Sequence, residues 1–196
     1  GQIGADTNNN IGIAGLNWNS KVLPVRVSGK CGARLSDLLD GLRWAAGLPV
    51  TGQPTNPNPA KVINLSFGGS RTCAESPGYQ STIDAVTFAG SLVVVAAGNS
   101  DKPLTRPADC QRVMAVASVR RDGAKADYSS FGSNVALSAP GGSFEGGQNT
   151  AMLSLSNDAL MGPAADIAQY KQGTSFAAPQ AAGVASLMLS INPFLS

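Results

Sequence analysis

Residues 92–100 read LVVVAAGNS, and the first six positions form an unbroken run of apolar side chains that ends at a glycine. An apolar run of this length is typical of a strand buried on both faces, as in a parallel sheet covered by helices. Three further runs of this kind occur, at residues 21–27 (KVLPVRV), 61–65 (KVINL) and 113–119 (VMAVASV). We therefore predict a mainly parallel sheet built from these four segments.

Helical patterns separate the predicted strands. Apolar residues recur at helical spacing in residues 35–46 and again in residues 81–89. Near the end of the chain, residues 175–190 are apolar almost all round, which predicts a buried helix with Pro179 close to its first turn. Strands that alternate with helices predict a single α/β domain over residues 1–196.

Between the last predicted strand and the last helix, residues 140–172 follow no clear period. A short alternation of apolar and polar residues near 151–155 favours a hairpin there.

The composition excludes several classes of function. The formal net charge is only +2 and charged residues make up 13% of the chain. So weak a positive charge does not indicate binding to nucleic acid or to an anionic membrane. No apolar stretch approaches the roughly 20 residues that a membrane span needs. The GxGxxG and Walker motifs of nucleotide-binding domains do not occur, and residues 173–177 do not supply the GxSxG of an α/β-hydrolase.

Histidine does not occur in the sequence. This removes the usual general base and most zinc and haem schemes. A nucleophilic mechanism must therefore find its base in another residue type or outside this chain.

The three cysteines, Cys31, Cys73 and Cys110, show no CxxC pair and no metal-ligand spacing. They are either buried thiols of a reduced compartment, or one disulfide with an odd cysteine whose partner lies outside this segment.

A small-residue turn, Gly173-Thr174-Ser175, delivers a serine to the start of the predicted last helix. The unpaired N–H groups and the positive dipole end of a helix N-terminus suit an oxyanion forming beside that serine. Alternatively, Thr174 or Ser175 is simply the N-cap of the helix.

Two predicted strands end in residues that can meet a ligand, because ligands of parallel sheets bind beyond the carboxyl ends of the strands. Asn99 follows one strand and has an amide that can donate to a negative charge, although Gly98-Asn99 is also ordinary turn chemistry. Residues 66–69 (SFGG) follow another strand, and their glycines let an extended peptide pair with the main chain or simply form a loop exit.

Taken in order, VINLSFGGS (62–70), VVVAAGNS (93–100) and GTSFAAPQAAGVASLML (173–189) resemble the subtilase family of serine proteases, peptidase family S8. The resemblance covers essentially the whole chain and matches the C-terminal part of the catalytic domain. It implies a three-layer αβα fold with a mainly parallel sheet, lacking its N-terminal strands. Secreted, disulfide-containing bacterial subtilases are the most similar subgroup, through LPVRVSGKCG (23–32), GLRWAAG (41–47) and NPNPAKVINLSFGGS (56–70).

The resemblance also implies roles for individual residues. Ser175 matches the nucleophile, and Asn99 matches the side-chain oxyanion donor that acts with the Ser175 backbone N–H. Another set matches the substrate-binding residues: Gly32, Ala33, Arg34, Ser66, Phe67, Gly68, Gly69, Ala97, Gly98 and Thr174. The peptide bond between Arg106 and Pro107 matches a cis bond of the family.

For the cysteines, the resemblance implies a disulfide between Cys73 and Cys110 and a partner for Cys31 upstream of this chain. It further implies secretion to the extracellular space, where disulfides persist.

In residues 6–15 (DTNNNIGIAG), the match is to a structural calcium loop with oxygen ligands from Thr7, Asn9, Ile11 and Ile13. The alternative is an Asn-rich surface turn without an ion.

One departure from the family pattern concerns the catalytic triad. Family members place an aspartate after the first strand and a histidine near the start of the following helix, in a stretch of the form HGTHVAG. Residues 1–5 match the tail of that helix. We therefore expect a serine endopeptidase that hydrolyses extended polypeptides through an acyl-enzyme, with the Asp and His supplied by an N-terminal segment of the same protease. The alternative is a catalytically inactive subtilase fragment or a peptide-binding module.

Overall fold

A computed structural model describes residues 1–158, 162 and 164–195. A four-stranded parallel sheet lies at its centre, in the order β1-β2-β3-β4. The strands are β1 (Val62–Leu65), β2 (Leu92–Ala96), β3 (Val113–Val119) and β4 (Val135–Pro140). In register, Val62 lies beside Leu92 and Val93 lies beside Val113.

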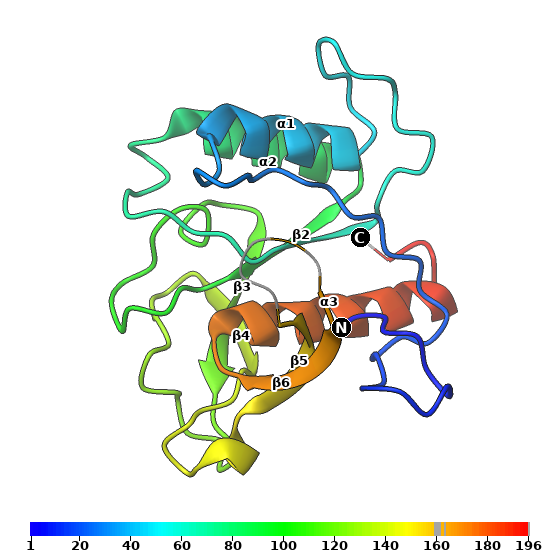
Figure 1. Ribbon diagram of the computed structural model, residues 1–196. Helices are drawn as coiled ribbons and strands as arrows, with labels where there is room; N and C mark the ends of the chain where they lie inside the picture. Colours follow the sequence, from blue (N-terminus) through cyan, green and yellow to red (C-terminus); the bar gives the residue numbers. More distant parts are fainter. Residues whose placement is uncertain (159–161, 163, 196) are drawn as a thin grey trace.

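Helices cover both faces of the sheet, which gives three layers (Figure 1). Helices α1 (Leu35–Ala45) and α2 (Pro77–Phe88) pack on one face, and α3 (Thr174–Ile191) packs on the other. The prediction of an αβα fold with a mainly parallel sheet is therefore confirmed. None of the helices in the described part of the chain has the length and apolar character needed to cross a membrane.

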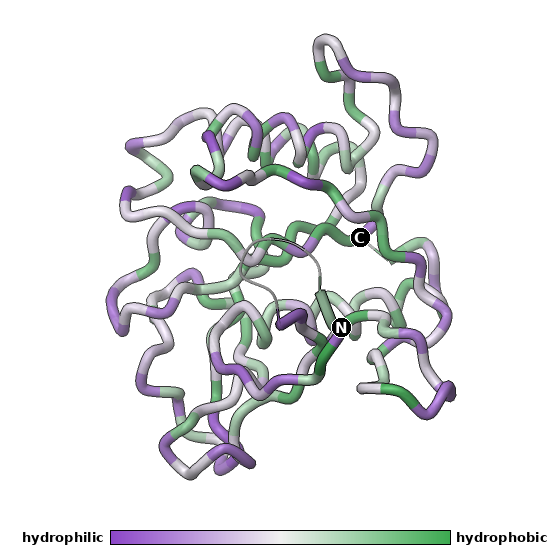
Figure 2. The backbone as a smooth tube through the Cα atoms, viewed as in Figure 1, coloured by the Kyte–Doolittle hydropathy of each residue, from purple (hydrophilic) through white to green (hydrophobic). Residues whose placement is uncertain are grey.

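The sheet separates two apolar cores because successive side chains of β2 point to opposite faces. Val93 and Val95 join the core under α1 and α2, and Val94 joins the core under α3. All three are completely buried, and Figure 2 shows apolar colouring along β2 in the middle of the molecule.

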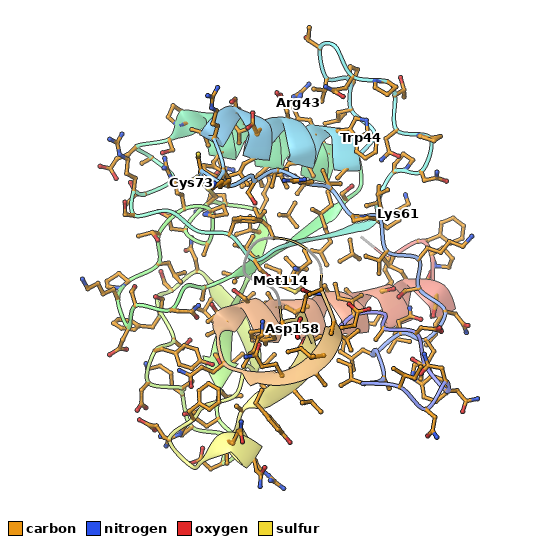
Figure 3. All side chains as sticks on the ribbon, viewed as in Figure 1. Arg43, Trp44, Lys61, Cys73, Met114 and Asp158 are labelled. Carbon is orange, nitrogen blue, oxygen red and sulfur yellow. A yellow bond between two sulfur atoms is a disulfide. The ribbon has the colours of Figure 1, made fainter. Side chains whose placement is uncertain are left out.

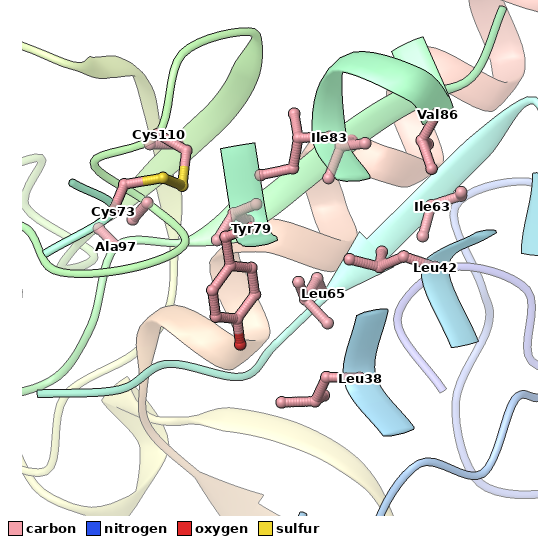
Figure 4. Packing of buried hydrophobic residues seen from close by; sticks show 14 of the residues in the cluster. Leu38, Leu42, Ile63, Leu65, Cys73, Tyr79, Ile83, Val86, Ala97 and Cys110 are labelled. Atoms are coloured by element: carbon pink, nitrogen blue, oxygen red, sulfur yellow. A yellow bond between two sulfur atoms is a disulfide. The ribbon is translucent and has the colours of Figure 1, made fainter. Parts of the chain in front are cut away.

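The two cores differ in the size of the side chains that the helices contribute. Under α1 and α2 the side chains are large, and Leu38, Tyr79 and Ile83 belong to one buried cluster with Leu65 of the sheet (Figure 4). Under α3 they come mainly from alanines, with Met114 of β3 packed against them (Figure 3). Small side chains let α3 approach the sheet closely, which brings the N-terminal end of α3 to the ends of β1 and β2.

The predicted strand at residues 21–27 is wrong, because these residues form no strand. Within the described ranges no strand lies beside them, and most of them line a groove that β1 also lines. The sequence pattern records the apolar character of the segment, whereas a strand also requires a hydrogen-bonded partner.

Other boundaries differ in detail. Helix α2 begins at Pro77, four residues before the predicted start at 81, and the hairpin expected near 151–155 is the antiparallel pair β5 (Met152–Asn157) and β6 (Asp166–Lys171). Strand β4 was not predicted, because its exposed side chains and its terminal proline weaken the apolar run. A short 3-10 helix, η1 (Gln148–Thr150), precedes β5.

Candidate active site

Ser175 is the second residue of α3 and lies half-buried at the helix N-terminus. Gly173, the N-cap residue just before α3, has φ 146° and ψ 155°, a conformation that favours glycine. A side chain at this position would also come within 3.3 Å of Nδ2 of Asn99. Glycine is therefore needed to bring the serine and the asparagine together.

The orientation of the Asn99 amide is fixed by Thr174. Oδ1 of Asn99 accepts hydrogen bonds from both the backbone N–H and the hydroxyl of Thr174, each 2.8 Å long. Because the backbone N–H can only donate, the atom facing it must be the amide oxygen. Nδ2 is therefore directed away from Thr174 and remains available as a donor.

Asn99 and Ser175 lie close together. The Cβ position that Gly173 lacks lies 3.3 Å from Nδ2 of Asn99 and 3.7 Å from the backbone nitrogen of Ser175. Both residues line the same pocket, where an anionic oxygen would meet the positive end of the α3 dipole and could accept from these two N–H groups. Such an arrangement can stabilise the oxyanion of acyl transfer.

Thr174 has a wider structural role than the sequence indicated. Its side chain is completely buried, and its hydroxyl also accepts a hydrogen bond of 3.1 Å from the N–H of Gly98. The hydroxyl therefore ties the end of the β2 segment to the start of α3. The sequence placed Thr174 among the substrate-binding residues and, alternatively, left Thr174 or Ser175 as the N-cap of the helix, whereas the N-cap in the structure is Gly173.

Tyr128 was not predicted and lies behind the serine turn. Its hydroxyl accepts from the N–H of Gly173 (3.0 Å), donates to the carbonyl of Gly142 (2.6 Å) and contacts the hydroxyl of Ser118 (2.7 Å). Burial raises the pKa of Tyr128 above its ordinary value. The tyrosine thus joins three segments that support the turn, and no motif in the sequence pointed to it.

A pocket of about 240 Å³ opens beside Ser175. It is lined by residues 66–69, 96–100, 105–106 and 174–175. The structure therefore brings together all the predicted site residues from these segments.

Gly32, Ala33 and Arg34 do not line this pocket. They are exposed and lie immediately before α1, where Gly32 closes a tight turn with Gly29. These three predicted substrate-binding residues therefore lie outside the pocket around Ser175.

Pro179 lies in the second turn of α3, just beyond the predicted first turn, because the helix begins one residue earlier, at Thr174. Proline has no N–H, so the carbonyl of Ser175 receives no helical hydrogen bond from this position. The hydroxyl of Ser66 donates to that carbonyl instead, at 3.4 Å. The edge at residues 66–69 is thereby linked to the turn that carries the serine.

Oγ of Ser175 makes no hydrogen bond within the described ranges. The chain also contains no histidine. No general base therefore contacts the serine within this part of the chain.

A groove of about 790 Å³ separates residues 21–27 from β1 and reaches α3. Its lining is largely apolar and includes Val22, Val25 and Ile63. Asn64 also lines it, and Oδ1 of Asn64 is buried without a hydrogen-bond donor among the described residues. A buried oxygen without a donor raises the free energy of the folded state. A hydrogen-bond donor from another segment would therefore be favoured at this position.

The predicted disulfide between Cys73 and Cys110 is confirmed, with the two Cα atoms 5.2 Å apart (Figure 4). Cys31 is a free, exposed thiol. The bond between Arg106 and Pro107 is cis, as the resemblance implied.

The predicted calcium loop offers oxygens that suit a hard cation. Oδ1 of Asn9 accepts one hydrogen bond, from the N–H of Ile11 at 3.0 Å, and the hydroxyl of Thr7 donates a hydrogen bond to the carbonyl of Ala5. Within the described residues, the carbonyls of Thr7, Ile11 and Ile13 accept no hydrogen bond. These neutral oxygens fit Ca²⁺, although none of the four predicted ligands supplies a carboxylate.

Comparison with known proteins gives consistent results. The model of the "Subtilase family" matches residues 1–196. The "Extracellular protease" of Xanthomonas campestris is 45% identical over 196 residues, covering 98% of this chain and 32% of that protein. The "Extracellular basic protease" of Dichelobacter nodosus is 42% identical over 192 residues, covering 97% of this chain and 30% of that protein.

Among solved structures, a protease from Pseudoalteromonas arctica is similar to the whole chain. The TM-score is 0.95 and the identity 45%, with 100% of this chain and 58% of that chain covered. A cold-adapted subtilisin-like serine proteinase shares 28% identity at a TM-score of 0.67, over 91% of this chain and 56% of that chain. The chain thus spans only about a third of the length of the first two relatives.

Proposed function

This chain belongs to the subtilase family, and from that premise we propose that it is the nucleophile-bearing part of a serine endopeptidase. The proposal is carried by one observation: Ser175 at the N-terminus of α3 and the Asn99 amide, which Thr174 holds in place, line the same pocket. The pocket that opens there has room for a substrate side chain.

The proposed reaction is acyl transfer. Oγ of Ser175 attacks the carbonyl carbon of the scissile peptide bond, and a base accepts the hydroxyl proton. The carbonyl oxygen becomes an oxyanion held by Asn99 and the backbone of Ser175. The amine then leaves with a proton from the same base, and water hydrolyses the acyl-enzyme to restore the serine.

The substrate class we propose is extended polypeptide. Residues 66–69 follow β1 and include two glycines, so a peptide backbone can approach and pair with this edge. The exposed residues 32–34 would contact the other side of the same peptide.

We propose that the base and its orienting carboxylate come from another polypeptide segment, which carries His and Asp and precedes this chain in the family's order of motifs. Ser175 has no base in the described part of the chain, and a serine without its base loses nearly all the catalysis of an intact triad. The groove between residues 21–27 and β1 suits an extended apolar segment. A donor on that segment would satisfy Oδ1 of Asn64.

Two further expectations accompany this function. Secretion is supported by the names of two relatives, "Extracellular protease" and "Extracellular basic protease", and by the disulfide. Structural calcium at Thr7, Asn9, Ile11 and Ile13 is supported by the unused oxygens of that loop.

A fluorophosphonate reagent tests the proposal, because it reacts only with a serine that a base activates. The polypeptide that contains this chain together with the His- and Asp-bearing segment is compared with this chain alone and with a Ser175→Ala control. We expect a covalent mass increase on the peptide containing Ser175, only when both segments are present and only with serine at 175. Peptide binding without labelling of the assembled protein would instead identify a binding module.

A further inference from the structure

Arg106 belongs to the wall of the pocket beside Ser175. Its carbonyl accepts a hydrogen bond of 2.9 Å from the N–H of Gly69, and its own N–H donates to the carbonyl of Arg71, also at 2.9 Å. These bonds fix the backbone of Arg106 along the edge at residues 66–69.

The guanidinium group lies directly against Gly69. A Cβ at this glycine would fall 2.7 Å from Nε and 3.3 Å from Nη2 of Arg106. A side chain at position 69 would therefore displace the arginine, and glycine leaves the guanidinium in contact with the substrate edge.

The guanidinium of Arg106 forms no ion pair with a carboxylate in the described part of the chain. Hydrogen bonds from Thr72 lower the pKa of the more distant Glu75, and the charge of Arg106 also helps to lower it. Nη1 donates to the hydroxyl of Ser76, and the guanidinium carbon lies 5.7 Å from the centre of the Tyr79 ring. Nε is buried and has no acceptor, and no carboxylate in the described ranges comes within 4.0 Å of the group. The carboxylate of Glu75 is exposed and already accepts two hydrogen bonds of 2.8 Å from Thr72.

The adjoining helix adds to the positive potential. Ser76 is the N-cap of α2, and the first turn of α2 contains no acidic residue. A helix N-terminus carries a partial positive charge and ordinarily favours an anion. Arg106 places a cation there instead, so an anionic group entering the pocket would be favoured by both.

We propose that Arg106 makes this site select substrates with an acidic side chain among the residues that precede the scissile bond. This inference rests on the proposed endopeptidase function and names its substrate class. A carboxylate reaching Arg106 accepts charge-assisted hydrogen bonds from the guanidinium, and the same charge disfavours lysine and arginine at that position.

The test uses the assembled protease and a panel of matched peptides. Each peptide carries Glu or Gln at one of the four positions before the cut, with all other positions neutral. We expect at least one position where kcat/KM for Glu exceeds that for Gln about tenfold or more, because a hydrogen bond to a charged group contributes on this scale. Arg106→Gln should reduce this ratio to about one.

Arg112→Gln is the matched control, because Arg112 pairs with Asp84 and does not line the pocket. It should leave the Glu/Gln ratio unchanged. If Arg106→Gln does not fold, the wild-type ratio is measured against ionic strength, and it should fall as salt screens the charge.

Two failures are distinguishable. If the neutral peptides are cleaved and no position favours Glu, or if the preference survives Arg106→Gln or does not respond to salt, the inference is overturned while the endopeptidase function stands. If the wild-type protein cleaves no peptide and takes no fluorophosphonate label, both are overturned.

Discussion

Replacing Thr174 by valine tests whether its hydroxyl positions the oxyanion donor. The substitution keeps the size of the buried side chain and removes two hydrogen bonds, one to Oδ1 of Asn99 (2.8 Å) and one from the N–H of Gly98 (3.1 Å). The backbone N–H of Thr174 still donates to Asn99. The amide therefore keeps one of its two anchors and gains rotational freedom.

The expected loss of kcat lies between the loss caused by removing one hydrogen bond and the loss caused by removing the Asn99 amide itself. Removing the oxyanion asparagine of subtilisin lowers kcat by about 10²–10³-fold. Losing one of the two hydrogen bonds that hold the Asn99 amide should therefore lower kcat about tenfold. KM should stay nearly constant, because the interaction strengthens mainly in the transition state. Stability should fall by about 1–3 kcal/mol, since the N–H of Gly98 is left buried without a partner.

The assay measures kcat and KM of the assembled protease on a neutral peptide, with active sites counted by fluorophosphonate titration. Thr174→Ser is the matched control, because serine keeps the hydroxyl and should retain most of the activity. A Thr174→Val protein that is folded and turns over within about twofold of wild type would refute the positioning role, since even one lost anchoring bond predicts a larger effect.

Three other perturbations have defined outcomes. Replacing Cys73 and Cys110 by serine opens a loop with a sequence separation of 37 and should lower the free energy of unfolding by about 3–4 kcal/mol, measured by urea denaturation. Tyr128→Phe should cost about 1–3 kcal/mol at neutral pH, because it removes the hydroxyl that joins Gly173 and Gly142. Burial raises the folded-state pKa of Tyr128, so this contribution should be complete below the ordinary tyrosine pKa and disappear as pH rises through the folded value; an equal cost at every pH would contradict it. Chelating calcium should lower the Tm of the assembled protein, and re-adding Ca²⁺ but not Mg²⁺ should restore it, whereas no shift in Tm would argue for an ion-free turn.

The sequence predicted the layered fold because burial leaves a clear local signal. The run at residues 92–97 is apolar without interruption, since β2 is covered on both faces. Residues 21–27 give a similar signal and form no strand, because strand pairing depends on a neighbour that the local pattern does not contain. Strand β4 was missed for the opposite reason, since it pairs with β3 while exposing most of its side chains.

The candidate site was predictable where family motifs mark it and less so where tertiary contacts create it. Ser175 and Asn99 were found from their motifs, but the role of the Thr174 hydroxyl depends on which loops meet in space. Tyr128 lies 45 residues from Gly173 in the chain and carried no signal at all. The role proposed for Arg106 depends on its contact with Gly69, and no periodic pattern in the sequence predicts this contact.

Pro179 interrupts the hydrogen-bond ladder of α3. Because the proline removes one rung of the helical hydrogen-bond ladder, the turn that bears Ser175 can open without breaking the bonds of the following turns. In hydrogen–deuterium exchange, we expect amides before position 179 to exchange faster than those from position 181 onward, and Ser66→Ala to widen that difference by releasing the carbonyl of Ser175. The turn that bears Ser175 is thus held mainly by contacts outside the helix, from Ser66, Asn99 and Tyr128, whereas the later turns of α3 keep their own helical hydrogen bonds.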